Sequence, residues 1–181
     1  SIDMEKKIMT DKLVLSGMRP TGPLHLGHYF GALENWLSLQ DSGDYNCFFF
    51  SADWHALTTG YEDSSNIAKY RREIVAEWMA IGLDPKKVTI FAQALVPAHA
   101  ELATLFSMIT PIPWLERVPS YKEMRQELSD RDLSTVGFLQ YPLLQTADIA
   151  VYRGTHVPVG EDQLAHVELA RMVVRRFNNL Y

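Results

Sequence analysis

Cysteine is almost absent from this sequence: Cys47 is the only one among 181 residues. A single cysteine excludes a disulfide framework within the chain and a zinc site built on cysteines. No apolar run reaches the roughly 18 residues that a membrane-spanning helix needs, and residues 1–11 are too polar and charged for a signal peptide. We therefore expect a cytoplasmic protein that has no membrane partner.

Neither sign of charge dominates: 17 lysines and arginines stand against 22 aspartates and glutamates, a formal net charge of -5. This balance argues against a chain that is basic throughout and coats nucleic acid. Internal repeats, low-complexity tracts and Ser/Gly linkers are missing as well. Because 47% of the residues are hydrophobic and 22% are charged, the chain can bury a sizeable core, and its length fits one large domain.

What is present is an alternation of strand and helix patterns. Short apolar segments predict four buried strands, at residues 12–18, 45–52, 88–93 and 149–152. Apolar residues at helical spacing predict helices at about 27–37, 67–81 (capped by Ser64 or Ser65 and ended by Gly82), 97–109 and 160–177.

This alternation predicts a Rossmann-like α/β fold, a doubly wound parallel sheet with a mostly helical insertion at about 97–134. Ligands of such sheets bind at the carboxyl ends of the strands. The residues expected to meet a ligand are therefore those that follow each predicted strand, at 17–28, 52–57, 93–99 and 157–163.

The turn after the first predicted strand reads SGMRPTGPLHLGHYFGA. In it, His25 and His28 bracket Gly27 at the start of a predicted helix. A glycine there lets a bulky group approach the backbone, and the free amides of a helix start favour phosphate. Histidines can donate hydrogen bonds to phosphoryl oxygens as charge develops on them. The alternative is an ordinary turn that carries two surface histidines.

This turn matches the His-X-Gly-His signature of class I aminoacyl-tRNA synthetases. Two later blocks, YPLLQTADI and VPVGEDQ, resemble the tryptophanyl-tRNA synthetases. The resemblance extends along nearly the whole chain, through ADWHALT, LDPKK, VPAHAE, LERV and GEDQLAHVELAR. It implies activation of L-tryptophan with ATP to tryptophanyl-adenylate, transfer to tRNA(Trp), and a homodimer. Magnesium is expected with ATP from the chemistry; we see no metal-ligand motif.

The resemblance implies a tryptophan site. Asp148 precedes a predicted buried strand, where a carboxylate needs a partner, and its family counterpart accepts the indole N–H. Tyr141 and Gln163 match residues that hold the amino group of the substrate. An N-cap or a salt bridge is the alternative role for Asp148.

Further members of the predicted tryptophan site come from the same comparison. Val157 and Val159 match residues of the indole pocket, although taken alone they would be core residues. His55 matches a residue near the substrate. Gln145 stands where many family members have methionine, and a polar side chain there would change how the edge of the indole is held.

The resemblance also implies an ATP site, made of Gly17, Arg19, Gly27, Gly160, Glu161 and Asp162. A carboxylate can accept a hydrogen bond from a ribose hydroxyl, although acidic residues are also ordinary at a helix start. Arg19 stands where some family members have glutamine, so it could meet a phosphate or a carboxylate instead.

Two features of the family do not occur in the sequence: the Lys-Met-Ser-Lys-Ser loop and the helical anticodon-binding domain. The resemblance places both after Tyr181, so we expect an N-terminal part of a longer enzyme. Another adenylyl transferase of this fold, such as a tyrosyl-tRNA synthetase, stays open. So does a non-catalytic binding or dimerisation module, which the missing lysine loop favours. Residues 98–114 are more apolar than a short surface helix needs, so we expect the homodimer to be built on this insertion.

Overall fold

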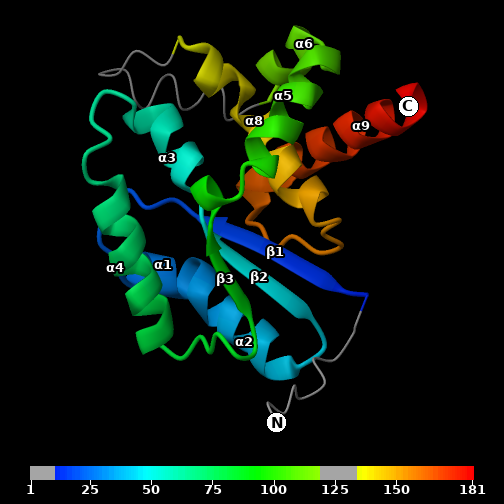
Figure 1. The fold of residues 1–181 in the computed structure, drawn as a ribbon. Helices are drawn as coiled ribbons and strands as arrows, with labels where there is room; N and C mark the ends of the chain where they lie inside the picture. The colour runs from blue at the N-terminus through cyan, green and yellow to red at the C-terminus, as the bar shows by residue number, and fades with distance from the viewer. Residues whose placement is uncertain (1–10, 119–133) are drawn as a thin grey trace.

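The centre of the protein is a parallel β-sheet. In the computed structural model, which describes residues 11–118 and 134–181, its strands are β1 (Leu13–Met18), β2 (Asn46–Ser51) and β3 (Thr89–Ala92). They lie side by side in the order β1-β2-β3 (Figure 1). Three of the predicted strands are therefore confirmed to within two residues. Their apolar side chains point to both faces, as in a sheet covered on both sides.

The predicted fourth strand is wrong. Residues 149–151 end the long helix α8 (Val136–Val151), which begins at Thr135, whose hydroxyl accepts a hydrogen bond from the Phe138 amide. A short apolar run fits a buried helix as well as a strand. Among residues 11–118 and 134–181, the sheet gains a single isolated bridge at the outer edge of β1, where Leu15 N donates to His156 O at 3.0 Å.

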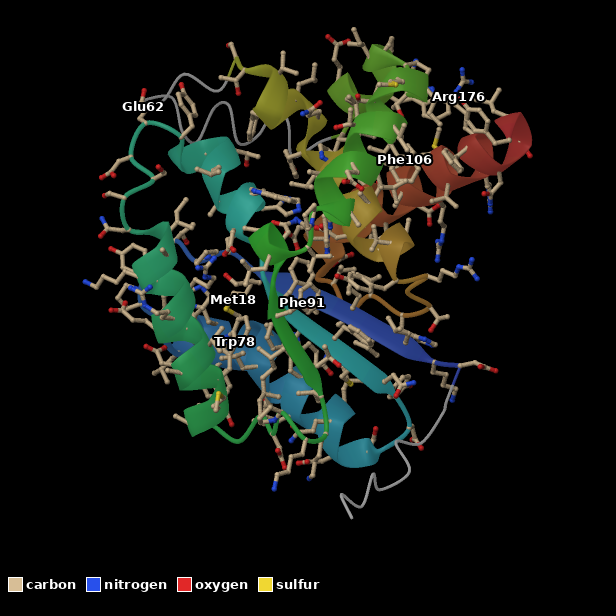
Figure 2. All side chains as sticks on the ribbon, in the orientation of Figure 1. Met18, Glu62, Trp78, Phe91, Phe106 and Arg176 are labelled. Carbon is tan, nitrogen blue, oxygen red and sulfur yellow. The ribbon has the colours of Figure 1, made fainter. Side chains whose placement is uncertain are left out.

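One face of the sheet is covered by the helices that follow β1 and β2. They are α1 (Leu26–His28), the π-helical turn η1 (Tyr29–Leu33), α2 (Glu34–Ser42) and α4 (Ile67–Ala80). Trp36 stacks on Phe49 with ring centroids 4.3 Å apart, and the buried Trp78 meets Trp36 edge-on. Figure 2 shows Trp78 between α4 and the sheet. Burial of these large rings fixes the helices on the sheet.

The boundaries of α4 differ slightly from the prediction. Its N-cap is Asn66 rather than Ser64 or Ser65, because the Ser65 hydroxyl donates to Asp63 at 2.6 Å and is engaged in a local turn. Its end is as predicted: Gly82 follows with a φ of 117°, a conformation that favours glycine.

The second face of the sheet packs against the end of α8, where Ile149 and Tyr152 join Leu15 and Phe50 in one apolar cluster. The rest of α8 packs with α5 (Ala98–Ile109), α6 (Ile112–Glu116) and α9 (Leu164–Leu180) in a helical layer towards the top of Figure 1; the short helix α3 (Asp53–Gly60) follows β2. Phe106 of α5 lies edge-on to Phe177 of α9, with ring centroids 5.7 Å apart, and Arg176 Nε donates to Ile109 O (Figure 2). Helices on both faces make this a Rossmann-like α/β fold.

Two further predictions concern the ends of this helical layer. The last helix is preceded by a 3-10 turn, η3 (Glu161–Gln163), and runs three residues past the predicted end. The predicted insertion at 97–134 contains α5 and α6, while residues 119–133 lie outside the described residues, so its extent stays a prediction. In the part of the chain that the structure describes, no helix combines the length and apolarity needed to cross a membrane.

Candidate active site

A cavity of about 260 Å³ opens at the carboxyl ends of β1 and β2. It lies where the sheet meets α3 and α8, the place where sheets of this kind bind ligands. It brings together residues that lie far apart in the sequence. Seven of the predicted site residues line it: Gly17, Arg19, His55, Tyr141, Gln145, Asp148 and Gln163.

The wall formed by the sheet depends on a glycine. Gly17 pairs with Phe50 in the register of β1 and β2, and a Cβ at Gly17 would lie 2.5 Å from Phe50 Cζ. The glycine therefore makes room for the Phe50 ring, which itself lines the cavity and is buried.

We expect Gly17→Ala to lower the free energy of unfolding by about 1–3 kcal/mol, because the added methyl must displace a packed ring. Displacing Phe50 also changes the cavity wall, so ligand affinity should fall in the same variant. Urea denaturation and calorimetric titration measure the two effects. Gly22→Ala is the matched control, since a Cβ at Gly22 meets nothing within 4 Å; equal losses in both variants would contradict the expectation.

The centre of the site is the carboxylate of Asp148. The sequence predicts Asp148 just before a strand, but the residue lies inside α8 and is only 3% exposed. Oδ2 accepts a hydrogen bond from His55 Nε2 at 2.8 Å. Oδ1 accepts from Gln93 Nε2 at 2.7 Å and from His99 Nδ1 at 2.6 Å. The predicted need for a partner is thus met by three donors from three other segments.

These donors keep Asp148 ionised. Burial by itself would raise the pKa of Asp148, but the charges and hydrogen bonds of His55 and His99 lower it below its ordinary value. Tyr152, whose hydroxyl lies 2.8 Å from His99 Nε2, responds in the opposite way: burial and the nearby Asp148 charge raise the pKa of Tyr152 to about 12. The site therefore combines a buried anion with a tyrosine that keeps its proton.

Sequence reasoning missed Gln93, His99 and Tyr152 as members of the site. Gln93 and His99 are both fully buried, and Gln93 Oε1 also accepts from the Trp54 amide at 2.9 Å. A signal for Gln93 and His99 did exist, because they are the first and last residues of the stretch 93–99, which follows the third predicted strand and was expected to meet a ligand. Tyr152 gave none, since it ended a segment that was expected to be a strand.

Tyr141 and Gln163 lie on the side of the cavity formed by α8 and η3. The Tyr141 hydroxyl lies 2.6 Å from Nε2 of His166, which is buried on α9. Burial lowers the pKa of His166, an effect that His55 reinforces and Asp162 opposes. A neutral His166 can accept a hydrogen bond from the Tyr141 hydroxyl at this nitrogen. Gln163 donates to Asp162 Oδ2 at 3.0 Å and leaves its own carbonyl oxygen as an acceptor.

The lowered pKa of His166 predicts that the protein loses stability on acidification. A folded-state pKa below the unfolded value of about 6.5 means that the unfolded state binds protons first as the pH falls. Stability is complete above about pH 6.5 and decreases below it, with a contribution of the same sign from His28, whose pKa burial and His25 lower. Urea denaturation between about pH 7.5 and 5 measures this, and His166→Gln should show a weaker dependence. An unchanged slope in that variant would assign the effect elsewhere.

The two histidines of the signature cap one helix start. His25 Nδ1 accepts from Gly27 N at 3.1 Å, His28 Nδ1 accepts from His25 N at 3.3 Å, and the ring centroids lie 3.9 Å apart. With both Nδ1 atoms accepting, each neutral ring carries its proton on Nε2. A Cβ at Gly27 would lie 2.9 Å from His25 Cε1. The glycine thus makes room for the His25 ring, and the Gly27 amide is already engaged in a hydrogen bond to His25 Nδ1.

Other predicted residues lie elsewhere. Val157 lines a second cavity of about 660 Å³, together with Tyr45 and Arg171, so the structure does not bring it to the wall that contains Asp148. Val159 borders neither cavity and precedes Gly160, the N-cap of η3. Glu161 and Asp162 form the exposed first turn of η3. Among the described residues, no group of three His, Cys, Asp or Glu side chains is placed to hold a metal ion.

This fold and site define a class of protein. A sequence model of the family described as tRNA synthetases class I (W and Y) matches residues 9–181. The chain therefore belongs to the class I tRNA synthetases for tryptophan and tyrosine.

Particular members of the family are similar to most of the chain. The tryptophan–tRNA ligase of Ralstonia nicotianae is 59% identical over 173 residues, which cover 96% of this chain and 43% of that protein. The corresponding ligase of Thermotoga maritima is 59% identical over 168 residues, 93% of this chain and 51% of that protein. The chain spans about half the length of these curated relatives.

A solved structure shows the same fold. The crystal structure of tryptophanyl-tRNA synthetase from Campylobacter jejuni, complexed with ADP and tryptophan, matches with a TM-score of 0.83 and 35% sequence identity. The match covers 92% of this chain and 50% of that one.

Proposed function

We propose that the protein carrying this chain activates L-tryptophan with ATP to tryptophanyl-adenylate and transfers the tryptophan to tRNA(Trp). The observation that carries the proposal is Asp148, a buried carboxylate on the wall of a cavity whose other lining includes the rings of Phe50 and Phe138. An aromatic cavity with one buried acceptor suits a large ring that bears a single N–H. The two ligases that are 59% identical to this chain over the aligned residues are both named for tryptophan.

Binding of tryptophan uses residues that already line the cavity. Asp148 accepts the indole N–H, and His55 stands beside the same carboxylate oxygen. The Tyr141 hydroxyl and the Gln163 carbonyl accept from the ammonium group. Gln145 lies at the same wall as Asp148 and meets the edge of the indole. We assign Val157 and Val159 to the indole pocket only through the family resemblance, since they lie outside the cavity.

In the chemical step, a carboxylate oxygen of tryptophan attacks the α-phosphorus of ATP. An O–P bond forms while the bond to the bridging oxygen of the β-phosphate breaks, and pyrophosphate leaves. No side chain acts as nucleophile, so the protein contributes positioning and charge stabilisation. The Nε2–H groups of His25 and His28 donate to phosphate oxygens.

The nucleotide is held on both sides of the cavity mouth. Gly17 and Arg19 line the cavity at the end of β1, where Arg19 is a cation for the phosphates. Gly160, Glu161 and Asp162 lie at η3, where the two carboxylates accept from ribose hydroxyls. Magnesium arrives with the phosphates of ATP, which supply its oxygen ligands; among the described side chains no cluster suits a resident metal.

Thermal denaturation with single amino acids in the presence of ATP tests the choice of substrate. Tryptophan should raise the melting temperature, since a ligand stabilises the folded state to which it binds. A rise with tyrosine alone would instead identify a tyrosyl-tRNA synthetase. Tryptophan-dependent exchange of pyrophosphate into ATP tests the reaction, and its absence in the protein that carries this chain would favour a non-catalytic module.

A homodimer is part of the same proposal. On α5, Phe106 is buried in the helical layer, while Leu105 and Met108 are 48% and 73% exposed and Ile112 of α6 is 59% exposed. Clustered apolar exposure of this kind marks an interface, and the commonest arrangement is a symmetric dimer. Light scattering should give the mass of a dimer at micromolar concentration, and Met108→Glu should shift it towards the monomer. A monomer throughout would contradict the proposal.

We place the protein in the cytoplasm, where its single buried thiol, Cys47, stays reduced.

A further inference from the structure

His99 belongs to the site but lies behind the cavity and not in its wall. Its side chain is 0% exposed and is not part of the cavity wall. It stands in the first turn of α5, where Nδ1 lies 2.6 Å from Asp148 Oδ1 and Nε2 lies 2.8 Å from the Tyr152 hydroxyl. His99 is therefore a link between the carboxylate of the site and a tyrosine at the end of α8.

The two carboxylate oxygens of Asp148 differ in their hydrogen-bond partners. An ionised carboxylate offers about four acceptor positions. Two on Oδ1 are used by Gln93 and His99, neither of which lines the cavity. One on Oδ2 is used by His55, which does line it. The remaining position is therefore on Oδ2, the oxygen whose protein partner is itself a cavity residue.

Tyr152 selects the form of His99 that this arrangement needs. A tyrosine hydroxyl that donates to Nε2 leaves the imidazole proton on Nδ1, where it points at Asp148 Oδ1. The opposite tautomer would place a lone pair against a carboxylate oxygen at 2.6 Å, which is repulsive. When His99 is neutral, the chain Tyr152–His99–Asp148 thus has one self-consistent set of donors and acceptors.

We propose that His99 is a positioning residue: oriented by Tyr152, it holds Asp148 so that Oδ2 is presented to the cavity, and it thereby sets the selectivity for a ligand ring that donates an N–H. The inference rests on the proposed function for the identity of the ligand, tryptophan. A purely structural role is the competing explanation, because the His99 ring also lies 5.9 Å from the rings of Phe50 and Phe91.

The two explanations differ in what they predict for a ligand without the N–H. The probe is the pair L-tryptophan and β-(3-benzothienyl)alanine, in which sulfur replaces the indole N–H. Loss of packing alone would weaken both ligands equally. Loss of orientation at Asp148 would weaken tryptophan selectively, so the ratio of the two affinities reports on positioning.

The variants separate the functions of the ring. His99→Leu removes both hydrogen bonds, while His99→Asn keeps an amide N–H near the place of Nδ1. Tyr152→Phe removes only the hydroxyl. His156→Leu is the matched control, since this histidine is exposed and lies outside the site.

We expect the wild type to prefer tryptophan by about tenfold or more, the increment of a hydrogen bond to a charged group. His99→Leu should bring the ratio close to one, His99→Asn should restore most of the preference, and Tyr152→Phe should fall between them. His156→Leu should match the wild type. An unchanged ratio in His99→Leu, with both affinities lowered alike, would overturn the proposal.

A measurement without ligand keeps this inference separate from the proposed function. Nitrogen-15 NMR of the histidine side chains should show His99 as the Nδ1–H tautomer, with a second tautomer populated in Tyr152→Phe. An Nε2–H tautomer in the wild type would overturn the positioning role whatever the ligand is. Failure of tryptophan to bind the wild type, with the Nδ1–H tautomer present, would refute the proposed substrate and leave the orientation of Asp148 supported.

Discussion

Replacing Asp148 with alanine is expected to lower the free energy of unfolding by about 3 kcal/mol or more, because three donors lose their acceptor and each buried unsatisfied group costs about 1–3 kcal/mol. His55, Gln93 and His99 would each lose an acceptor, and Gln93 and His99 are fully buried. Guanidinium denaturation measures the loss. Asp41→Ala is the matched control: its ion pair with Lys87 is exposed, and such pairs contribute less than about 1 kcal/mol.

The same substitution should weaken tryptophan binding by at least about tenfold and reduce the discrimination against phenylalanine, because the acceptor for the indole N–H is gone. Calorimetric titration with both amino acids measures this. Asp148→Asn preserves the size of the side chain and one carbonyl oxygen, so it should be more stable than the alanine variant while still losing selectivity. Full discrimination against phenylalanine in the alanine variant would refute the role of Asp148.

Replacing His25 with alanine is expected to slow tryptophan-dependent pyrophosphate exchange by about 10²–10³, the usual effect of removing one donor to a developing charge. The capping bond to Gly27 is lost as well, which costs about 1 kcal/mol of stability. Tryptophan affinity should stay unchanged, because His25 lies outside the wall that surrounds the amino acid. His156→Ala is the control with the same change of side chain. A rate within about threefold of the wild type would contradict phosphate stabilisation by His25.

Much of the fold could be predicted because apolar runs and helical spacing are local properties of the sequence. The strands at 12–18, 45–52 and 88–93 are found within two residues of their predicted bounds. The segment at 149–152 was misassigned because its apolar side chains face the sheet from a helix, and a run of four residues does not distinguish these cases.

Many of the residues of the site could be predicted from the sequence, but the hydrogen bonds between them could not. Motifs placed Asp148, His55 and Tyr141 together, and the structure lines one cavity with all three. The donors Gln93 and His99 escaped notice because their chemistry arises only when the turn after β3 folds against α8. Val157 shows the converse, since a position carried over from the family lies beside a different cavity here.

The link between Trp54 and Asp148 has a consequence for motion. Trp54 N–H donates to Gln93 Oε1, and Gln93 Nε2 donates to Asp148 Oδ1, so a backbone amide at the start of α3 is separated from the carboxylate by one side chain. Opening that amide to solvent requires Gln93 to move. A ligand that immobilises Asp148 therefore also slows deuterium uptake at the Trp54 amide. In the absence of ligand, the exchange rate of this one amide proton reports how often the site opens locally.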